Sequence, residues 1–295
     1  MKKKVIIFGG SGFLGSHVAD ELSLQGFDVT IFDLKNSKWL REDQKFIKGN
    51  ILDIKSLEKA IKKSSIVFNF ASISDIGKSL LNPIDTAKVN ILALIQILKL
   101  CVKYKIKQYV HASTVYVSGE HGGFYKSSKL ASESYVEEFY KIYGLKYTIL
   151  RYGTLYGPRS DINNGLHQII KNAILKQRVE YSGDPNAMRD YINVLDAAKA
   201  STKALLSDFE NKIIIISGSE TKKVKDILKM ISETMSFKNK IKYIKRDKVK
   251  LHAHYIHTPY TFKESLIMKF NENFHIDIGQ GILSLIKELK TIYKK

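Results

Sequence analysis

The sequence contains little cysteine or proline and no long apolar run. Its single cysteine, Cys101, excludes an internal disulfide and lies in an apolar helical pattern, where a packed thiol is expected. Four prolines leave no room for a Pro-rich linker. No stretch approaches the roughly 18 uncharged apolar residues of a membrane span, and the apolar run after the basic start is too short for a signal peptide. We therefore expect a globular, cytoplasmic protein.

Acidic residues are also scarce compared with basic ones. The 295-residue chain has 48 Lys and Arg against 29 Asp and Glu, which gives a net charge of +19. Such a charge can attract nucleic acid or anionic lipid. The excess is lysine scattered over many segments, however, with no basic helix face. We therefore expect no nucleic-acid or membrane partner, and we expect the charge to help attract anionic substrates. Arginine occurs only at positions 41, 151, 159, 178, 189 and 246.

Short apolar strands alternate with helical patterns through the first half of the chain. This alternation predicts an α/β fold with a parallel, doubly wound sheet of the Rossmann type. Gly26 and Gly144 fall where helix C-caps are expected, and Pro83 suits the first position of a long helix. The expected strands are KKVIIFG, DVTIFDL, FIKGNI, SIVFNFAS, QYVHAS and KYTILRYG, and the expected helices cover 13–25, 56–63, 83–104 and 125–143.

The alternation loosens after Gly157, where the sequence becomes more polar. Helical patterns remain near 194–206, 223–236 and 279–293, and IIIISG at 213–218 suits a strand. We expect a Rossmann domain over residues 1–157 and a smaller, mainly substrate-binding part over 158–295. The strand at 213–218 can return to the main sheet.

Gly9, Gly12 and Gly15 follow the first strand and open the first helix. In this context the first glycine permits a tight turn, the second lets a pyrophosphate approach the backbone, and the third lets helix and sheet pack closely. The phosphates then lie at the helix N-terminus. The alternative is a glycine-rich turn without a ligand.

Aspartates after the next two strands bear on the identity of the ligand. Asp33 ends the second strand, where its carboxylate can accept hydrogen bonds from adenosine ribose hydroxyls and repel a 2′-phosphate. This favours NAD over NADP as the cofactor, although Lys35 and Lys38 are placed to pair with an extra phosphate. Asp53 follows the third strand, and either an adenine contact or a helix cap suits that position.

Tyr125 and Lys129 are four residues apart in a helical pattern, so their side chains share one face. An ammonium close to a phenol favours the phenolate and lowers the pKa of the phenol toward neutral pH. Such a pair can take a proton from a hydroxyl group. An exposed helix face is the alternative, because tyrosine and lysine are abundant here.

Together with its GxxGxxG turn, the chain resembles the extended short-chain dehydrogenase/reductase family of NAD-dependent nucleotide-sugar epimerases and dehydratases over nearly all of residues 4–220. HASTVY, at 111–116, resembles the Ser/Thr cluster of that family. The resemblance makes Tyr125 and Lys129 catalytic and gives Thr114, with Ser113 second, the role of donating a hydrogen bond to the reacting oxygen. The expected cofactor-binding residues are Gly9, Gly12, Phe13, Leu14, Gly15, Asp33, Asp53, Ala71, Tyr125 and Lys129.

Two later segments resemble family motifs that bind substrate. LRYGTLYGPR at 150–159 and AMRDYINVLDAAKA at 187–200 imply that Arg189 binds the diphosphate of a nucleotide sugar and that Arg159 assists. Thr154 stands where the family commonly has a substrate-binding asparagine. Asn90 matches a family asparagine, but Ala93 and Leu94 replace the Gly-Thr that usually follows.

The expected reaction is oxidation at C4 of a nucleotide-diphosphate sugar. Return of the hydride to the opposite face gives a 4-epimerase, which we expect, and release of the ketone gives a 4-dehydrogenase or, in reverse, a 4-ketoreductase. A 4,6-dehydratase is disfavoured because the Asp-Glu pair that such enzymes carry before Val-Tyr is missing after Thr114. A different class also stays open, a non-catalytic dinucleotide-binding sensor or RNA-associated protein.

Two further expectations concern metals and partners. His252, His254 and His257 have no acidic or cysteine companion in their segment, so we expect no metal. The family resemblance implies a homodimer built from the helices at 83–104 and 125–143. Tyr140 and Tyr143 suit either that interface or the core.

Overall fold

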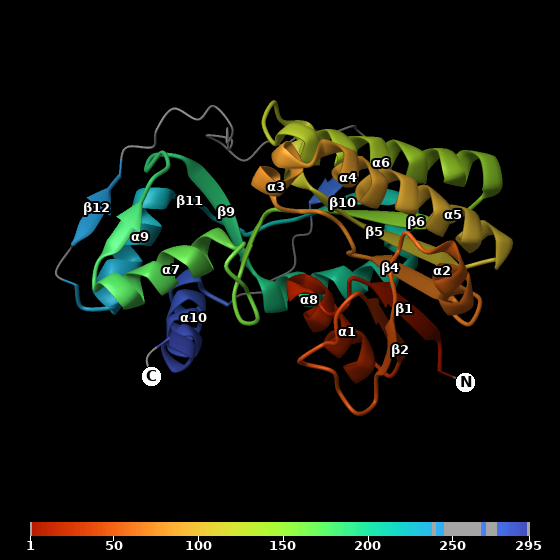
Figure 1. Cartoon of the computed structure of the whole chain (residues 1–295), viewed down its shortest axis with the longest axis horizontal. Helices are drawn as coiled ribbons and strands as arrows, with labels where there is room; N and C mark the ends of the chain where they lie inside the picture. Colours follow the sequence, from red (N-terminus) through yellow and green to blue (C-terminus); the bar gives the residue numbers. More distant parts are fainter. Residues whose placement is uncertain (1, 238–239, 245–266, 270–275, 294–295) are drawn as a thin grey trace.

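The computed structural model describes residues 2–237, 240–244, 267–269 and 276–293. These residues form two bodies, of which the larger is an eight-stranded sheet with helices on both faces (Figure 1). Its strands are β1 (Lys4–Phe8), β2 (Asp28–Asp33), β3 (Lys45–Lys48), β4 (Ile66–Asn69), β5 (Gln108–Thr114), β6 (Tyr147–Tyr152), β10 (Lys212–Ile216) and β13 (Ile267–Lys269).

All neighbouring strands of this sheet are parallel, in the order β13-β10-β6-β5-β4-β1-β2-β3. The chain runs outward from β1 to β3 on one side and then crosses back to continue with β4 on the other. The connections that leave β1 and β4 therefore diverge, which opens a crevice at the carboxyl ends of these strands. The fold confirms the predicted doubly wound, Rossmann-type sheet.

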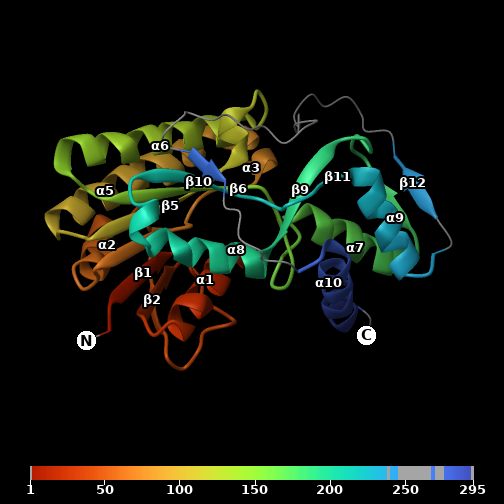
Figure 2. The same ribbon diagram turned by 180° about the vertical axis from the view of Figure 1, so that it is seen from behind.

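The sheet is apolar on both faces because helices cover both. Along β1, Val5 and Ile7 belong to one buried cluster, whereas Ile6 and Phe8 belong to another. Such near-continuous apolar strands are typical of a parallel sheet buried on both sides. Helices α1 (Phe13–Leu24) and α8 (Val194–Thr202) lie side by side on the first face, and α2 (Ile54–Ile61), α5 (Ala93–Lys103) and α6 (Gly123–Tyr143) cover the second (Figures 1 and 2).

Two helices end next to the glycines that predicted their C-termini, and one begins at the predicted proline. Gly26 (φ 84°) and Gly144 (φ 68°) adopt the left-handed conformation just after α1 and α6. Pro83 is the first residue of α4 (Pro83–Ala87), which follows the short α3 (Ile76–Leu81). The helix expected over 83–104 is interrupted, because a π-helical turn, η1 (Lys88–Leu92), lies between α4 and α5.

The smaller body has its own apolar core, which joins residues of α7 (Gly165–Lys176), α9 (Val224–Thr234) and α10 (Ile278–Tyr293). Two small sheets complete it, one of β7 (Thr154–Tyr156), β9 (Met188–Asn193) and β11 (Thr221–Lys223), the other of β8 (Val179–Tyr181) and β12 (Ile241–Tyr243). The strand expected at 213–218 is β10, which lies in the main sheet. Residues after 157 therefore contribute to both bodies. No helix in the described ranges has the length and apolar character needed to cross a membrane.

Candidate active site

The glycine turn lies between β1 and the neighbouring strands at the switch point of the sheet. Gly9 has φ 75°, and its backbone N–H donates to the carbonyl oxygen of Phe32 at 3.0 Å. A Cβ atom at Gly9 would lie 2.6 Å from the backbone nitrogen of Ala71, which follows β4. Only glycine tolerates this combination of positive φ and close contact. The turn therefore joins the ends of three strands.

The same turn brings α1 against the sheet and leaves its N-terminus open. A Cβ atom at Gly15 would lie 2.3 Å from the carbonyl oxygen of Gly9. Gly12 is the N-cap residue of α1 and provides no side-chain cap, and Phe13 and Leu14 form the start of the helix. The hydroxyl of Ser11 is buried without a hydrogen-bond partner among the described residues. Uncapped N–H groups beside a free hydroxyl suit the pyrophosphate of a dinucleotide.

The two predicted adenosine-side aspartates have different surroundings. The carboxylate of Asp33 accepts hydrogen bonds from the backbone nitrogens of Ser11, at 3.0 Å, and Lys35, at 3.3 Å, so it is tied to the glycine turn. Asp53 caps α2, accepting from the backbone nitrogen of Lys55 at 3.1 Å and from the hydroxyl of Ser56. The bond from Ser56 holds the pKa of Asp53 below its ordinary value. Asp53 is therefore the N-cap residue of α2, which is one of the two roles that its position in the sequence suggested.

Tyr125 and Thr114 meet through their side chains at the carboxyl end of β5. Tyr125 lies in the first turn of α6, and Thr114 is the last residue of β5. Burial raises the pKa of Tyr125 to about 12, and the hydrogen bond with the Thr114 hydroxyl opposes that rise. Thr114 Oγ1 also accepts from the backbone nitrogen of Tyr116 at 3.3 Å, which fixes the hydroxyl near Tyr125.

Lys129 is enclosed one helical turn after Tyr125, with 4% of its surface exposed. Its ammonium group donates to the carbonyl oxygen of Ala112 on β5 at 2.8 Å. Burial lowers the pKa of Lys129 to about 8, and the nearby Glu133 carboxylate acts in the opposite direction. We expected Lys129 to lower the pKa of Tyr125. In the protein without a bound ligand, burial has the largest effect on this pKa and raises it, and the group that lowers it is Thr114.

A buried ion pair lies beneath these residues, and the sequence reasoning missed it. Arg151 of β6 donates to both carboxylate oxygens of Glu133 on α6, from Nε at 2.9 Å and from Nη2 at 2.6 Å. The Ser113 hydroxyl also donates to Glu133, at 2.5 Å, and Arg151 Nη1 donates to Ser118 Oγ at 3.2 Å. Ser113 is therefore engaged with Glu133, whereas Thr114 is engaged with Tyr125. The spacing of Glu133 four residues after Lys129 was a usable signal, because it places the carboxylate on the same helix face.

Asn90 connects the π turn to the loop that follows β4. Its Oδ1 accepts from the backbone nitrogen of Ile73 at 2.8 Å, and its Nδ2 donates to the Ile73 carbonyl at 3.0 Å and to Ser128 Oγ at 2.9 Å. Asn90 thus fixes the loop beside Ala71 to α6, one residue before Lys129. π turns are rare and are often found at functional sites. Through Asn90, this one holds the loop after β4 against α6.

The predicted substrate residues come from the junction of the two bodies. Thr154 begins β7 and pairs with Tyr191 of β9. Arg189 is a buried residue of β9 whose Nη1 donates to the carbonyl oxygen of Met188 at 2.8 Å.

Arg159 follows the end of β7 and links the two bodies. Its Nη2 donates to Asp20 of α1 at 2.7 Å, its guanidinium carbon lies 5.3 Å from the ring centre of Trp39, and its backbone nitrogen donates to Glu288 of α10 at 3.1 Å. The Nη1 atom of Arg159, in contrast, is buried without a hydrogen-bond partner among the described residues.

The described residues contain no group of three or more His, Cys, Asp or Glu side chains that could hold a metal ion. His252, His254 and His257 lie outside the described residues.

A family model described as "NAD dependent epimerase/dehydratase family" matches residues 5–217, which is more than half of the chain. The chain belongs to this family. Its members use NAD as cofactor, and the open glycine turn described above fits that group.

Relatives that match nearly the whole chain agree with this assignment. A protein of Methanocaldococcus jannaschii described as "Putative UDP-glucose 4-epimerase" is 30% identical, over 97% of this chain and 98% of its own. The UDP-glucose 4-epimerase of Thermotoga maritima, solved with UDP-glucose, is 25% identical and has a TM-score of 0.84, covering 98% of this chain and 99% of its own. The UDP-N-acetylglucosamine 4-epimerase of Methanobrevibacter ruminantium, solved with UDP-N-acetylmuramic acid, is 25% identical and has a TM-score of 0.85, covering 99% and 100%.

Proposed function

We propose that the protein is a UDP-sugar 4-epimerase that uses NAD to oxidise and re-reduce C4 of the sugar. The observation that carries the proposal is the convergence of Thr114, Tyr125 and Lys129 at the carboxyl end of β5, in a sheet whose switch point carries the open glycine turn. The three relatives are described as 4-epimerases of UDP-sugars, which supports UDP as the nucleotide and C4 as the reacting carbon.

In this proposal the glycine turn binds the pyrophosphate of NAD through the backbone of Gly12, Phe13 and Leu14, and Asp33 binds the adenosine ribose. Bound NAD supplies a hydride acceptor and a positively charged nicotinamide ring. A positive charge close to Tyr125 lowers the pKa of the phenol, in the same direction as the bond from Thr114. Lys129 adds a second positive charge and is held in place by the Ala112 carbonyl.

Tyr125 then takes the proton of the C4 hydroxyl, while the Thr114 hydroxyl donates a hydrogen bond to the same oxygen. Ser113 does not share this role, because its hydroxyl donates to Glu133. Arg189 binds the diphosphate of the sugar nucleotide, and Thr154 lines the sugar side. Arg159, whose guanidinium contacts Asp20 and Trp39, holds the two bodies together around the substrate.

A nucleotide-sugar 4-dehydrogenase or 4-ketoreductase is the alternative, since the same three residues perform its single hydride step. The two activities differ in whether the keto sugar turns over inside the site or leaves it. A 4,6-dehydratase is disfavoured, because Val115 and Tyr116 directly follow Thr114 and form the short helix η2 (Val115–Ser118), without an acidic pair.

We also propose a homodimer formed through α5 and α6, which lie side by side on one face (Figure 1). Large apolar side chains stay exposed on α6 and on η1, the turn that leads into α5. Among them are Leu92 of η1 and Leu130 and Ile142 of α6, at 56%, 46% and 66%. Exposed apolar residues gathered on neighbouring helices favour a protein interface. Tyr140 and Tyr143 lie close to Tyr147 and Phe139, respectively, and both are partly exposed.

The substitution Tyr125→Phe tests the proposed base. We expect the rate of interconversion of UDP-glucose and UDP-galactose to fall by about 10²–10⁴-fold, because the phenol is the group that moves the proton. NAD binding, measured by calorimetry, should stay nearly unchanged. Retained turnover in the variant would reject the assignment of Tyr125.

A panel of UDP-, GDP-, CDP- and dTDP-sugars, followed at 340 nm and by NMR of the products, separates the alternatives. An epimer without net NADH indicates the epimerase, and a keto sugar with stoichiometric NADH indicates the dehydrogenase. RNA binding that persists at about 200 mM salt, without turnover of any sugar, would favour the non-catalytic class.

A further inference from the structure

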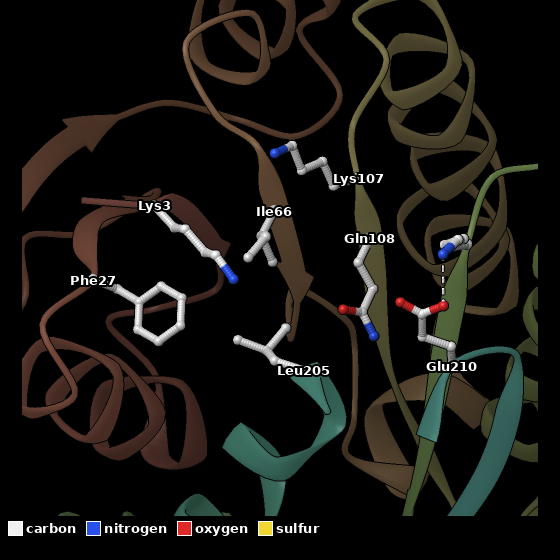
Figure 3. A pocket seen from close by; sticks show the side chains of 8 residues that line it. Lys3, Phe27, Ile66, Lys107, Gln108, Leu205 and Glu210 are labelled. Atoms are coloured by element: carbon white, nitrogen blue, oxygen red, sulfur yellow. Dashed lines mark hydrogen bonds and ion pairs between the residues drawn. The ribbon is translucent and has the colours of Figure 1, made fainter. Parts of the chain in front are cut away.

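A cavity of about 400 Å³ lies at the amino edge of the main sheet (Figure 3). This volume is within the range of about 300–1,000 Å³ typical of small-molecule sites. Its walls are formed by residues at the starts of five strands and by two segments that follow α8. The lining residues are Lys3, Phe27, Ile66, Lys107, Gln108, Lys146, Leu205 and Glu210.

This cavity is separate from the candidate active site. Lys3, Phe27 and Lys146 directly precede β1, β2 and β6, whereas Thr114 and the glycine turn lie at the opposite, carboxyl ends of their strands. A ligand here would contact neither Tyr125 nor Lys129. Binding of a ligand in this cavity therefore does not depend on the proposed epimerase activity.

Charge in the cavity is unbalanced in favour of cations. The Lys146 ammonium donates to Glu210 at 2.7 Å, so these two charges offset each other. No ion pair within the described part of the chain involves Lys3 or Lys107. Figure 3 shows the Lys3 ammonium pointing between Ile66 and Leu205 toward the middle of the cavity. The two lysines leave a net positive charge that favours an anion.

Gln108 provides a fixed polar group opposite Lys3, with 6% of its surface exposed. Its Nε2 donates both hydrogens, to Thr148 Oγ1 at 3.0 Å and to the Ala204 carbonyl at 2.6 Å, which sets the direction of the amide. Figure 3 shows its Oε1 on the side of the cavity that faces Lys3 and Leu205. An N–H group of a ligand can therefore donate to this oxygen.

The remaining walls are apolar. Phe27 and Leu205 stand on one side of the cavity and Ile66 on another, so a flat ring would meet carbon atoms there (Figure 3). An aromatic wall, a fixed acceptor and two free ammonium groups together match a ligand that carries a ring with an N–H donor and a phosphate.

We propose that this cavity binds a nucleoside monophosphate. The phosphate would bind to the Lys3 ammonium, with Lys107 adding positive charge on the other side of Ile66. The base would lie against Phe27 and Leu205, and an N–H of the base would donate to Gln108 Oε1. Lys3 and Lys107 come from segments 104 residues apart, and the fold brings both to one cavity.

The test titrates UMP calorimetrically into the full-length protein already saturated with NAD and UDP-glucose, so that the other edge of the sheet is blocked. We expect one UMP per chain and at least tenfold weaker binding in K3M/K107M. The control K225M/K229M removes the same charge from exposed lysines on α9, in the smaller body, and should bind UMP as the unsubstituted protein does. Equal affinity in K3M/K107M and K225M/K229M would overturn the proposal.

Further titrations test the contributions of the base and of the phosphate separately. Phe27→Leu should weaken UMP several-fold, and uridine and inorganic phosphate should each bind at least tenfold more weakly than UMP. Inorganic phosphate binding as tightly as UMP would overturn the proposal, because the apolar wall and Gln108 would then contribute nothing. If UDP-glucose fails to bind but the loss in K3M/K107M is still seen, the epimerase proposal fails and this one stands.

Discussion

Ser113 and Thr114 are adjacent hydroxyl residues on β5, yet the sheet gives them opposite surroundings. Side chains alternate along a strand, so one hydroxyl meets Glu133 and the other meets Tyr125. The sequence placed both at the end of the strand without deciding between them. The difference predicts different consequences when each hydroxyl is removed.

Thr114→Val should lower kcat by roughly 10²–10³-fold, the usual cost of removing one hydrogen-bond donor to a developing oxyanion. Ser113→Ala should leave kcat within a few-fold and lower the free energy of unfolding by about 1.5–3 kcal/mol, because it loses a hydrogen bond to a charged group. For both variants, steady-state kinetics measures kcat and denaturant unfolding measures the free energy of unfolding. The reverse pattern would assign the catalytic hydroxyl to Ser113.

Burial of Lys129 makes the stability of the protein depend on pH. The pKa of Lys129 is about 8 in the folded chain and ordinarily 10.5. Between these values the unfolded chain binds more protons than the folded one, so the free energy of unfolding rises with pH in that window. Below pH 8 the buried charge destabilises the fold by a constant amount.

We expect Lys129 to contribute a slope of up to about 1.4 kcal/mol per pH unit between pH 8 and 10.5. Denaturant unfolding at several pH values measures it, as the difference between the unsubstituted protein and Lys129→Met. Parallel curves for the two proteins would show that Lys129 is charged without penalty in the fold.

At the scale of elements, the contact of α1 with the glycine turn decides the geometry of the cofactor site. The backbone of Gly9 is in contact with both Gly15 and Ala71, so the first helix and the loop after β4 meet at one residue. A side chain at Gly15 would push against backbone, which cannot move aside as a flexible side chain would.

Gly15→Ala should therefore destabilise the protein by about 1–3 kcal/mol and weaken NAD binding at least tenfold. Gly165→Ala is a matched control at the start of α7, because a Cβ atom there meets nothing within 4 Å. It should raise stability by about 0.4–1 kcal/mol. Thermal unfolding and calorimetric titration with NAD distinguish the two, and similar behaviour of both variants would contradict the role of Gly15.

The order of the elements could be predicted because parallel strands and crossover helices have strong periodic signals. The glycine turn, Gly26, Pro83 and Gly144 were predictable for the same local reasons. The π turn at Lys88–Leu92 was not, because it depends on the long-range bonds of Asn90. α7 was overlooked although Leu166, Ile170 and Ala173 have helical spacing. The spacing of Glu133 and Lys129 could have placed both on one helix face. The pairing of Glu133 with Arg151 could not be predicted, because it depends on the packing of α6 against β6.

On the scale of the whole molecule, the proposed dimer follows from the apolar side chains that η1 and α6 leave exposed. Leu92→Glu with Leu130→Glu should shift the protein to monomers, because burying two carboxylates in an apolar interface is unfavourable. Leu24→Glu, at an equally exposed position at the end of α1, should leave the mass unchanged. Sedimentation or light scattering measures the mass in solution. An unchanged dimer in the double variant would place the interface elsewhere.

The position of Trp39 has a practical consequence. It is the only tryptophan of the chain, and its ring contacts the arginine that also bonds to α1 and, through its backbone, to α10. Indole emission responds to a nearby cation and to water. Any ligand that moves the two bodies relative to each other will therefore change the intrinsic fluorescence of the unlabelled protein, which provides an optical signal for closure.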